Sequence, residues 1–169
     1  KPTRHSILQK SLVKLLAKKD EETMSSYEDP DSEDLHVLGE KHPLNILLAE
    51  DNMVNQKLAV LTLEKMGYQM DVVANGLEVL DAIRRQPYDL IFMDVQMPEM
   101  DGVEATKEIL KKYGNNRPVI VAMTANAMEG DRERFIEDGM DDYISKPISI
   151  DAIRNMLIKV SAKKISRTH

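Results

Sequence analysis

The sequence contains no cysteine, and no apolar run in it approaches the length that crosses a bilayer. The lack of cysteine excludes disulfides and thiolate metal sites, and it favours a reducing compartment. A membrane-spanning helix needs ~20 consecutive apolar residues, and residues 1–20 lack the apolar core and cleavage site of a signal peptide. We therefore predict a cytoplasmic chain that makes no contact with a membrane.

Two further features that the sequence lacks argue against two classes of function. The net charge is −6 and no dense cluster of lysine and arginine is present, which argues against a nucleic-acid partner. The loop after the first apolar run, residues 50–55, contains no glycine, whereas a nucleotide-binding enzyme needs a glycine-rich loop there. Most of the acidity is expected on the solvated surface, and the rest in a carboxylate cluster that needs a cation.

Short apolar runs alternate with amphipathic stretches along most of the chain. The runs are rich in valine and isoleucine, as strands buried on both faces are, and cover residues 45–49, 70–74, 90–93, 119–123 and 143–144. Helical patterns cover residues 54–67, in which Val54, Leu58 and Leu61 repeat at helical spacing, then 76–85, 103–113, 127–138 and about 150–160. This predicts an α/β fold with a five-stranded parallel sheet, doubly wound as (βα)5.

The pattern divides the chain into four predicted parts. One domain occupies residues 43–162, and a short tail follows at 163–169. Residues 20–42 are acidic with interspersed serines, which predicts a flexible linker. Residues 1–19 match residues 146–164 without a gap at seven positions, beginning with Lys1-Pro2 against Lys146-Pro147. We interpret residues 1–19 as the last helix of a preceding copy of the domain; a chance match between two lysine-rich amphipathic helices is the alternative.

Polar residues at the ends of the predicted strands form the candidate site. Glu50 and Asp51 follow the first strand, Asp94 the third, Thr124 the fourth and Lys146 the fifth. The carboxyl ends of parallel strands lie side by side, so these residues converge on one crevice. Three carboxylates repel each other unless a cation neutralises them, and oxygen ligands without His or Cys favour Mg²⁺, with Mn²⁺ as a substitute.

The same residues suggest chemistry on a phosphoryl group. Mg²⁺ prefers one or two carboxylates, which leaves one acid free to act as a nucleophile. The Lys146 ammonium and the Thr124 hydroxyl suit phosphoryl oxygens. Each residue alone has a simpler explanation: Asp94 as a turn cap, Lys146 as a surface lysine and Thr124 as a β-branched strand residue. The Lys146–Pro147 bond is a candidate cis peptide, a form that only about 5% of such bonds adopt.

Four motifs in this order resemble the receiver domain of two-component response regulators. They are residues 47–52 (LLAEDN), 94–102 (DVQMPEMDG), 123–127 (MTANA) and Lys146-Pro147. The resemblance covers residues 44–160 and implies the flavodoxin-like receiver fold. Residues 50–56 (EDNMVNQ) further resemble receivers fused to hybrid sensor histidine kinases. The chain would then be a fragment of such a kinase, and the receiver itself would catalyse only its own phosphorylation and dephosphorylation.

The resemblance implies a phosphoacceptor and a metal site. Asp94 would accept a phosphoryl group from the phosphohistidine of a histidine kinase domain or a histidine phosphotransfer protein. Asp51 would bind Mg²⁺ directly, Glu50 directly or through water, and Gln96 through its backbone carbonyl, with Asp94 completing the set. The domain would then switch conformation and pass on the signal or the phosphate.

The resemblance also implies which groups contact the phosphoryl group and which respond to it. Thr124, the Ala125 N–H and Lys146 would contact its oxygens. Tyr143 would be an aromatic switch that becomes buried when Thr124 moves toward the phosphate, although a strand tyrosine packed with its hydroxyl at the surface explains it equally well.

Two other functions compete with phosphate acceptance. A receiver that is never phosphorylated would serve only as an interaction module, but no acid and no lysine of the motifs is lost here. A phosphatase of the haloacid dehalogenase type would need a second acid two residues after Asp94, and that position is Gln96. Homodimerisation is left open by the sequence.

Overall fold

The computed structural model describes residues 35–125, 127–128 and 130–167. The predicted repeat at residues 1–19 and the linker up to residue 34 lie outside these residues. The elements in chain order are α3 (Leu38–Lys41), β1 (Ile46–Ala49), α4 (Met53–Lys65), β2 (Met70–Val73), α5 (Gly76–Arg85), β3 (Leu90–Asp94), α6 (Gly102–Tyr113), the 3₁₀ turn η1 (Gly114–Asn116), β4 (Val119–Thr124), α7 (Asp131–Glu137), β5 (Asp142–Ser145) and α8 (Ile150–Arg167).

The five strands form one parallel sheet in the order β2-β1-β3-β4-β5. β1 and β3 are buried at every position, which explains why both read as unbroken apolar runs in the sequence. Strand order reverses direction between β1 and β3, and a crevice is expected at such a point, outside the carboxyl ends of the strands. The predicted fold class is therefore confirmed.

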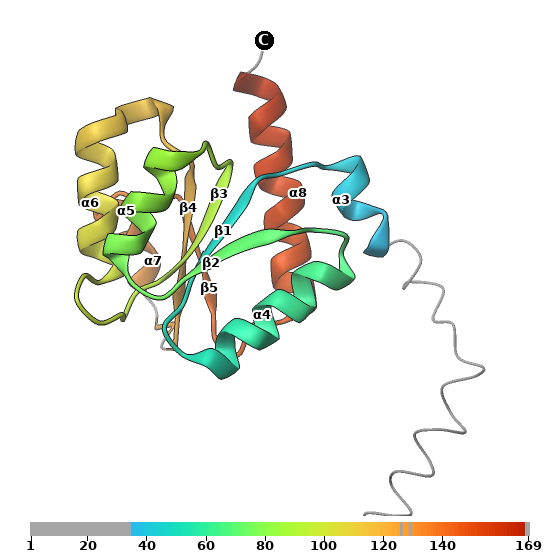
Figure 1. Ribbon diagram of the computed structural model, residues 1–169, viewed down its shortest axis with the longest axis horizontal. Helices are drawn as coiled ribbons and strands as arrows, with labels where there is room; N and C mark the ends of the chain where they lie inside the picture. Colours follow the sequence, from blue (N-terminus) through green and yellow to red (C-terminus); the bar gives the residue numbers. More distant parts are fainter. Residues whose placement is uncertain (1–34, 126, 129, 168–169) are drawn as a thin grey trace, which may run out of the picture. The chain divides into compact units, whose positions relative to one another are not determined.

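Helices cover both faces of the sheet (Figure 1). Alternate strand residues point to opposite faces, so that Leu48 and Phe92 pack with α4 and α8, whereas Leu47 and Ile91 pack with α5, α6 and α7. Each face has its own apolar core cluster, and the two clusters fix the strand ends relative to each other. Among the described residues, no helix combines the length and the apolarity that a membrane crossing requires.

α4 packs against the sheet through a different face from the one that its apolar stripe predicts. The predicted helix is present, but Val54, Leu58 and Leu61 are 76%, 45% and 48% exposed. The face toward the sheet is made by smaller or later residues of the helix, including Ala59 and Leu63, which are almost completely buried. Packing against β1 and α8 thus overrides the spacing, and it leaves an apolar stripe on the surface.

The chain from residue 35 to residue 42 differs from the predicted flexible linker. The short helix α3 buries Leu38 in the core cluster beneath α4 and α8. Its backbone meets the turn after α4 so closely that a Cβ added to Gly39 would lie 2.2 Å from the Gly67 carbonyl oxygen. His42 Nδ1 lies 3.0 Å from Ser161 Oγ of α8. This segment is thus fastened to the domain at the amino ends of the strands.

α7 and α8 differ in length from the predicted helices. α7 begins at Asp131, whose side chain accepts a hydrogen bond of 2.9 Å from the Met128 N–H, and residues 127–128, which the prediction placed in this helix, are not helical. α8 continues to Arg167, past the predicted tail boundary. Lys163 and Lys164 of its last turns pair with Asp141 and Asp89. The other domain boundaries stay predictions.

Candidate functional site

A cleft of about 560 Å³ opens at the carboxyl ends of β1, β3, β4 and β5, and we call it the acidic cleft. It is lined by seven of the eight predicted site residues: Glu50, Asp51, Asp94, Gln96, Thr124, Ala125 and Lys146. Tyr143 does not line it. The further lining residues are Asn52, Asn55, Val95, Val103, Met128, Asp131, Arg134 and Phe135. Residues far apart in the sequence therefore meet at one edge of the sheet.

Three carboxylates meet in the acidic cleft. Glu50, Asp51 and Asp94 each place an oxygen within 4.8 Å of the other two. Glu50 is 1% exposed and Asp94 5% exposed, whereas Asp51 is open to solvent. Two buried acids and one exposed acid at this separation repel each other, and a divalent cation entering from the solvent side would relieve the repulsion.

Lys146 is the counter-ion of the two buried acids. Its Nζ lies 2.8 Å from Asp94 Oδ2 and 2.6 Å from Glu50 Oε2. Burial by itself lowers the pKa of the Lys146 ammonium, but the hydrogen bonds and charges of Asp94 and Glu50 outweigh it and hold that pKa above its usual value. The lysine is therefore charged and held between the two carboxylates.

Asp94 is less acidic than an ordinary aspartate. Burial raises the pKa of its carboxyl and the neighbouring Glu50 charge adds to the rise, while hydrogen bonds from Lys146 and from the Gln96 N–H oppose it. The Gln96 N–H donates to Asp94 Oδ1 at 3.1 Å. The net rise in pKa means that burial and the Glu50 charge together outweigh the stabilisation of the carboxylate by Lys146 and the Gln96 N–H.

Glu50 is oriented by the start of α4. Its Oε1 accepts hydrogen bonds of 3.2 Å from the Asn52 N–H and from Asn55 Nδ2. Asn52 also caps α4, accepting from the Val54 and Asn55 N–H groups. Glu50 Oε2 is buried and has no partner among the described residues except the Lys146 ammonium. A buried carboxylate oxygen with a single ionic partner suits a cation ligand.

Sequence reasoning missed Asn55 as a partner of Glu50. The signal was available, because Asn52 and Asn55 stand at the capping spacing of a helix that directly follows the acids. Met128, Asp131 and Arg134, which also line the acidic cleft, left no such signal.

The loop after Asp94 is held tightly against the sheet. The Val95 N–H donates to the Met123 carbonyl of β4 at 3.2 Å, and the Gly102 N–H donates to the Val95 carbonyl at 3.1 Å. A Cβ on Gly102 would lie 2.2 Å from the Asp94 carbonyl oxygen, so only glycine allows α6 to start this close to Asp94. The acid is thereby fixed at the backbone as well as at the side chain.

Thr124, Ala125 and Lys146 line the acidic cleft at the ends of β4 and β5. The Lys146 N–H donates to the Thr124 carbonyl at 2.7 Å, which ties the two strand ends together. Thr124 is half-buried and Ala125 is exposed at the rim. The Lys146–Pro147 peptide, a candidate for the cis form in the sequence, is cis.

Tyr143 of β5 is half-buried and does not line the acidic cleft. Its ring packs against Phe135 of α7, with 6.2 Å between ring centroids and 39° between ring planes. Phe135 itself lines the acidic cleft, so the tyrosine is one residue removed from it. The switch role of Tyr143 stays a prediction.

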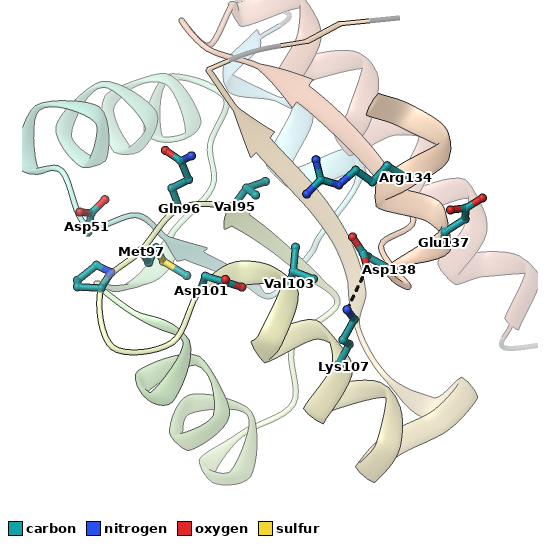
Figure 2. A pocket seen from close by; sticks show the side chains of 11 residues that line it. Asp51, Val95, Gln96, Met97, Asp101, Val103, Lys107, Arg134, Glu137 and Asp138 are labelled. Atoms are coloured by element: carbon teal, nitrogen blue, oxygen red, sulfur yellow. Dashed lines mark ion pairs between the residues drawn. The ribbon is translucent and has the colours of Figure 1, made fainter. Parts of the chain in front are cut away.

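A second hollow, of about 810 Å³, adjoins the acidic cleft, and we call it the side pocket (Figure 2). Five residues line both: Asp51, Val95, Gln96, Val103 and Arg134. On its far wall Lys107 of α6 pairs with Asp138 after α7, with 3.1 Å between Nζ and Oδ1. Because they share these five residues, the acidic cleft and the side pocket are continuous with each other.

Comparison with known proteins assigns the family. A sequence model of the response regulator receiver domain matches residues 46–158, and the chain belongs to that family. Histidine protein kinase 1 of Candida albicans is 42% identical over 133 residues, which are 73% of this chain and 5% of that protein. The first curated relatives, which include hybrid signal transduction histidine kinases of Dictyostelium discoideum, are much longer, and the match spans 5 to 15% of their length.

Solved receiver domains share the fold. The receiver domain of the sensor histidine kinase PA1611 of Pseudomonas aeruginosa, whose structure holds a magnesium ion in the active site cleft, is 39% identical with a TM-score of 0.64. The match covers 70% of this chain and 98% of that domain. A Saccharomyces cerevisiae complex of the histidine phosphotransfer protein Ypd1 with the receiver domain of Ssk1 matches at 28% identity and a TM-score of 0.65, over 72% and 90%.

Proposed function

We propose that this receiver domain accepts a phosphoryl group on Asp94 in a Mg²⁺-dependent reaction of a phosphorelay. One observation carries the proposal: Lys146 is shared between Asp94 and Glu50 beside the exposed carboxylate of Asp51. Asp94 is the acid at the end of the central strand and faces the acidic cleft. The magnesium ion in the similar cleft of the PA1611 receiver supports the metal requirement.

The residues present suit the metal. Asp51, Glu50 and Asp94 offer carboxylate oxygens, and the Gln96 carbonyl is proposed as a further ligand. These are hard ligands, which Mg²⁺ prefers and for which Mn²⁺ is expected to substitute. When bound, the ion would offset the negative charge of the phosphoryl oxygens.

The transfer step follows from the positions of the side chains. An Asp94 carboxylate oxygen forms a bond to phosphorus as the bond from phosphorus to the donor histidine nitrogen breaks, and the nitrogen keeps that electron pair. Lys146 moves its ionic contact from Asp94 to the phosphoryl oxygens. The Thr124 hydroxyl and the Ala125 N–H, which also line the acidic cleft, would donate to the same oxygens.

The proposed donor is a histidine kinase domain or a histidine phosphotransfer protein. The most exposed large apolar side chains of the described residues are Met53, Val54 and Met128, at 80%, 76% and 72%. Met128 lines the acidic cleft, and Met53 and Val54 directly follow its Asp51-Asn52 wall. An apolar rim around a charged centre suits a protein partner that delivers its histidine to Asp94. The Ypd1–Ssk1 complex pairs a histidine phosphotransfer protein with the receiver domain of a response regulator.

The signal would leave the site through the loop that carries Thr124. A phosphoryl group on Asp94 adds charge beside Thr124 and Lys146, and the loop after β4 leads to α7, whose Phe135 packs on Tyr143. We keep Tyr143 as the proposed switch residue on this basis. The full protein is proposed to be a hybrid histidine kinase in which this domain relays the phosphoryl group.

Intact mass spectrometry after incubation with acetyl phosphate tests the function. We expect one phosphoryl adduct that forms with Mg²⁺ and is absent with EDTA, because the transfer needs the ion to offset charge on the phosphoryl oxygens. Failure to form an adduct with either acetyl phosphate or a phosphorylated histidine phosphotransfer protein, with Mg²⁺ binding shown separately, would favour the unphosphorylated interaction module.

Lys146→Ala tests the assignment of the counter-ion. Removal of the ammonium leaves Glu50 and Asp94 without their ionic partner, so Mg²⁺ affinity is expected to be retained or to rise by up to about tenfold, which equals ~1.4 kcal/mol. Titration calorimetry measures it, and Lys159→Ala, which removes a surface lysine paired with Asp142, is the control. A large loss of Mg²⁺ affinity would mean that Lys146 organises the metal site and does not compete with it.

A further inference from the structure

The acidic cleft contains two cationic side chains, Lys146 and Arg134, and they differ in what they do. Lys146 is already held between Asp94 and Glu50. Arg134 makes no ion pair with any residue that the structure describes, although acids surround it. Asp138, four residues later on the same side, is paired with Lys107 of α6. Among the described residues that line the acidic cleft and the side pocket, Arg134 is therefore the cation without an ionic partner.

Arg134 is placed on the route into the acidic cleft. It lies on α7 and belongs to the wall that the acidic cleft shares with the side pocket. In Figure 2 its side chain runs from α7 toward Val95, the residue next to Asp94, while Asp51 and Gln96 lie across the opening. The side chain is exposed, so a solute that enters meets it before it reaches the buried carboxylates.

The carboxylates of the acidic cleft repel an anionic phosphoryl donor, and a cationic side chain at the opening would offset this repulsion. A phosphoryl donor is an anion, and it must approach Asp94 past Asp51 and Asp131 as well as Glu50. A guanidinium group offers two parallel N–H donors that match a pair of phosphoryl oxygens, and it keeps its charge at all relevant pH values. An unpaired arginine at the mouth lowers the electrostatic cost of bringing the donor in.

We propose that Arg134 is a donor-binding residue, which pairs with the oxygens of the incoming phosphoryl group and favours doubly charged donors. The proposal rests on the proposed phosphoacceptor function of Asp94 and deepens it. Arg134 takes no part in bond making and keeps its protons. The phosphoryl group still passes from the donor oxygen or nitrogen to Asp94, and the donor leaves with the electron pair of the broken bond.

The test compares two small donors on matched variants. Acetyl phosphate is a doubly charged anion at neutral pH, whereas phosphoramidate carries less net negative charge. For Arg134→Ala the rate of adduct formation with acetyl phosphate is expected to fall about fivefold at low ionic strength, and the difference should shrink in about 0.5 M salt. With phosphoramidate the fall should be smaller. Arg134→Lys should restore part of the rate, since it restores the charge but not the pair of parallel N–H donors.

Arg132→Ala is the matched control, because it removes the same charge from the same helix two residues away, at a position that lines neither hollow. It should react as the wild type does. An equal loss for both donors in Arg134→Ala, or equal rates for Arg134→Ala and Arg132→Ala, would overturn the proposal for Arg134. A wild-type protein that forms no adduct with either donor would instead overturn the phosphoacceptor function.

Discussion

Replacing Asp94 by asparagine is expected to abolish the phosphoryl adduct completely while the protein stays folded. The amide has the shape of the carboxylate but lacks the oxygen nucleophile, so no acyl phosphate forms. Burial raises the pKa of Asp94, which means that the native state holds this charge at a cost. The neutral amide is therefore expected to leave the melting temperature unchanged or higher, and intact mass with thermal denaturation measures both properties.

Asp131→Asn is the matched control for Asp94→Asn. It removes a carboxylate that lines the same acidic cleft, and the amide oxygen still accepts the hydrogen bond from the Met128 N–H. This variant should still form the adduct, at a rate equal to or above that of the wild type, because it removes one of the carboxylates that the donor passes. An adduct that persists in Asp94→Asn would place the phosphoacceptor elsewhere and would require peptide mapping of the modified residue.

Gly102→Ala is expected to be the most destabilising single-methyl substitution near the site. The new Cβ would lie 2.2 Å from the Asp94 carbonyl oxygen and 2.8 Å from Met93 Cγ, and the first of these contacts is with backbone. Relief requires α6 to move away from β3, which costs about 3 kcal/mol and lowers the melting temperature by roughly 10 °C. The adduct should also form more slowly, because Asp94 moves with its carbonyl group.

Gly114→Ala separates steric collision from backbone preference. Gly114 has φ +51 and nothing within 4 Å of an added Cβ, so alanine there meets only the conformational penalty, about 1–3 kcal/mol. Thermal and urea denaturation of the two variants compare the costs. If Gly102→Ala were no more destabilising than Gly114→Ala, the close contact between α6 and the Asp94 backbone would not limit stability.

The sequence predicted the sheet well because its strands are buried on both faces. Such strands appear as short unbroken apolar runs, and the observed strands agree with the predicted ones to within one or two residues. The same logic placed the polar residues at the strand ends, which is why Glu50, Asp94 and Lys146 were found together. Each of them directly follows or ends a strand, so its position depends on the sheet alone.

Helix orientation could not be predicted in the same way. The stripe of Val54, Leu58 and Leu61 on α4 is apolar but faces solvent, because the helix packs through another face, which carries Ala59, Thr62 and Leu63. Arg134 on α7 and Met128 before it reach the acidic cleft only because the loop after β4 sets the start of that helix. These positions depend on packing between elements, which periodicity does not contain.

The attachment of α3 has a consequence for how a partner module reaches Asp94. Residues 35–42 are fastened beside the turn after α4 and the end of α8, at the end of the sheet opposite to the acidic cleft. In the proposed hybrid kinase, a histidine-bearing module joined ahead of residue 35 would therefore start its path on the far side of this domain. Its effective concentration at Asp94 depends on whether the tether spans the height of the sheet, so shortening the tether should slow transfer within the chain and leave transfer from a free partner unchanged.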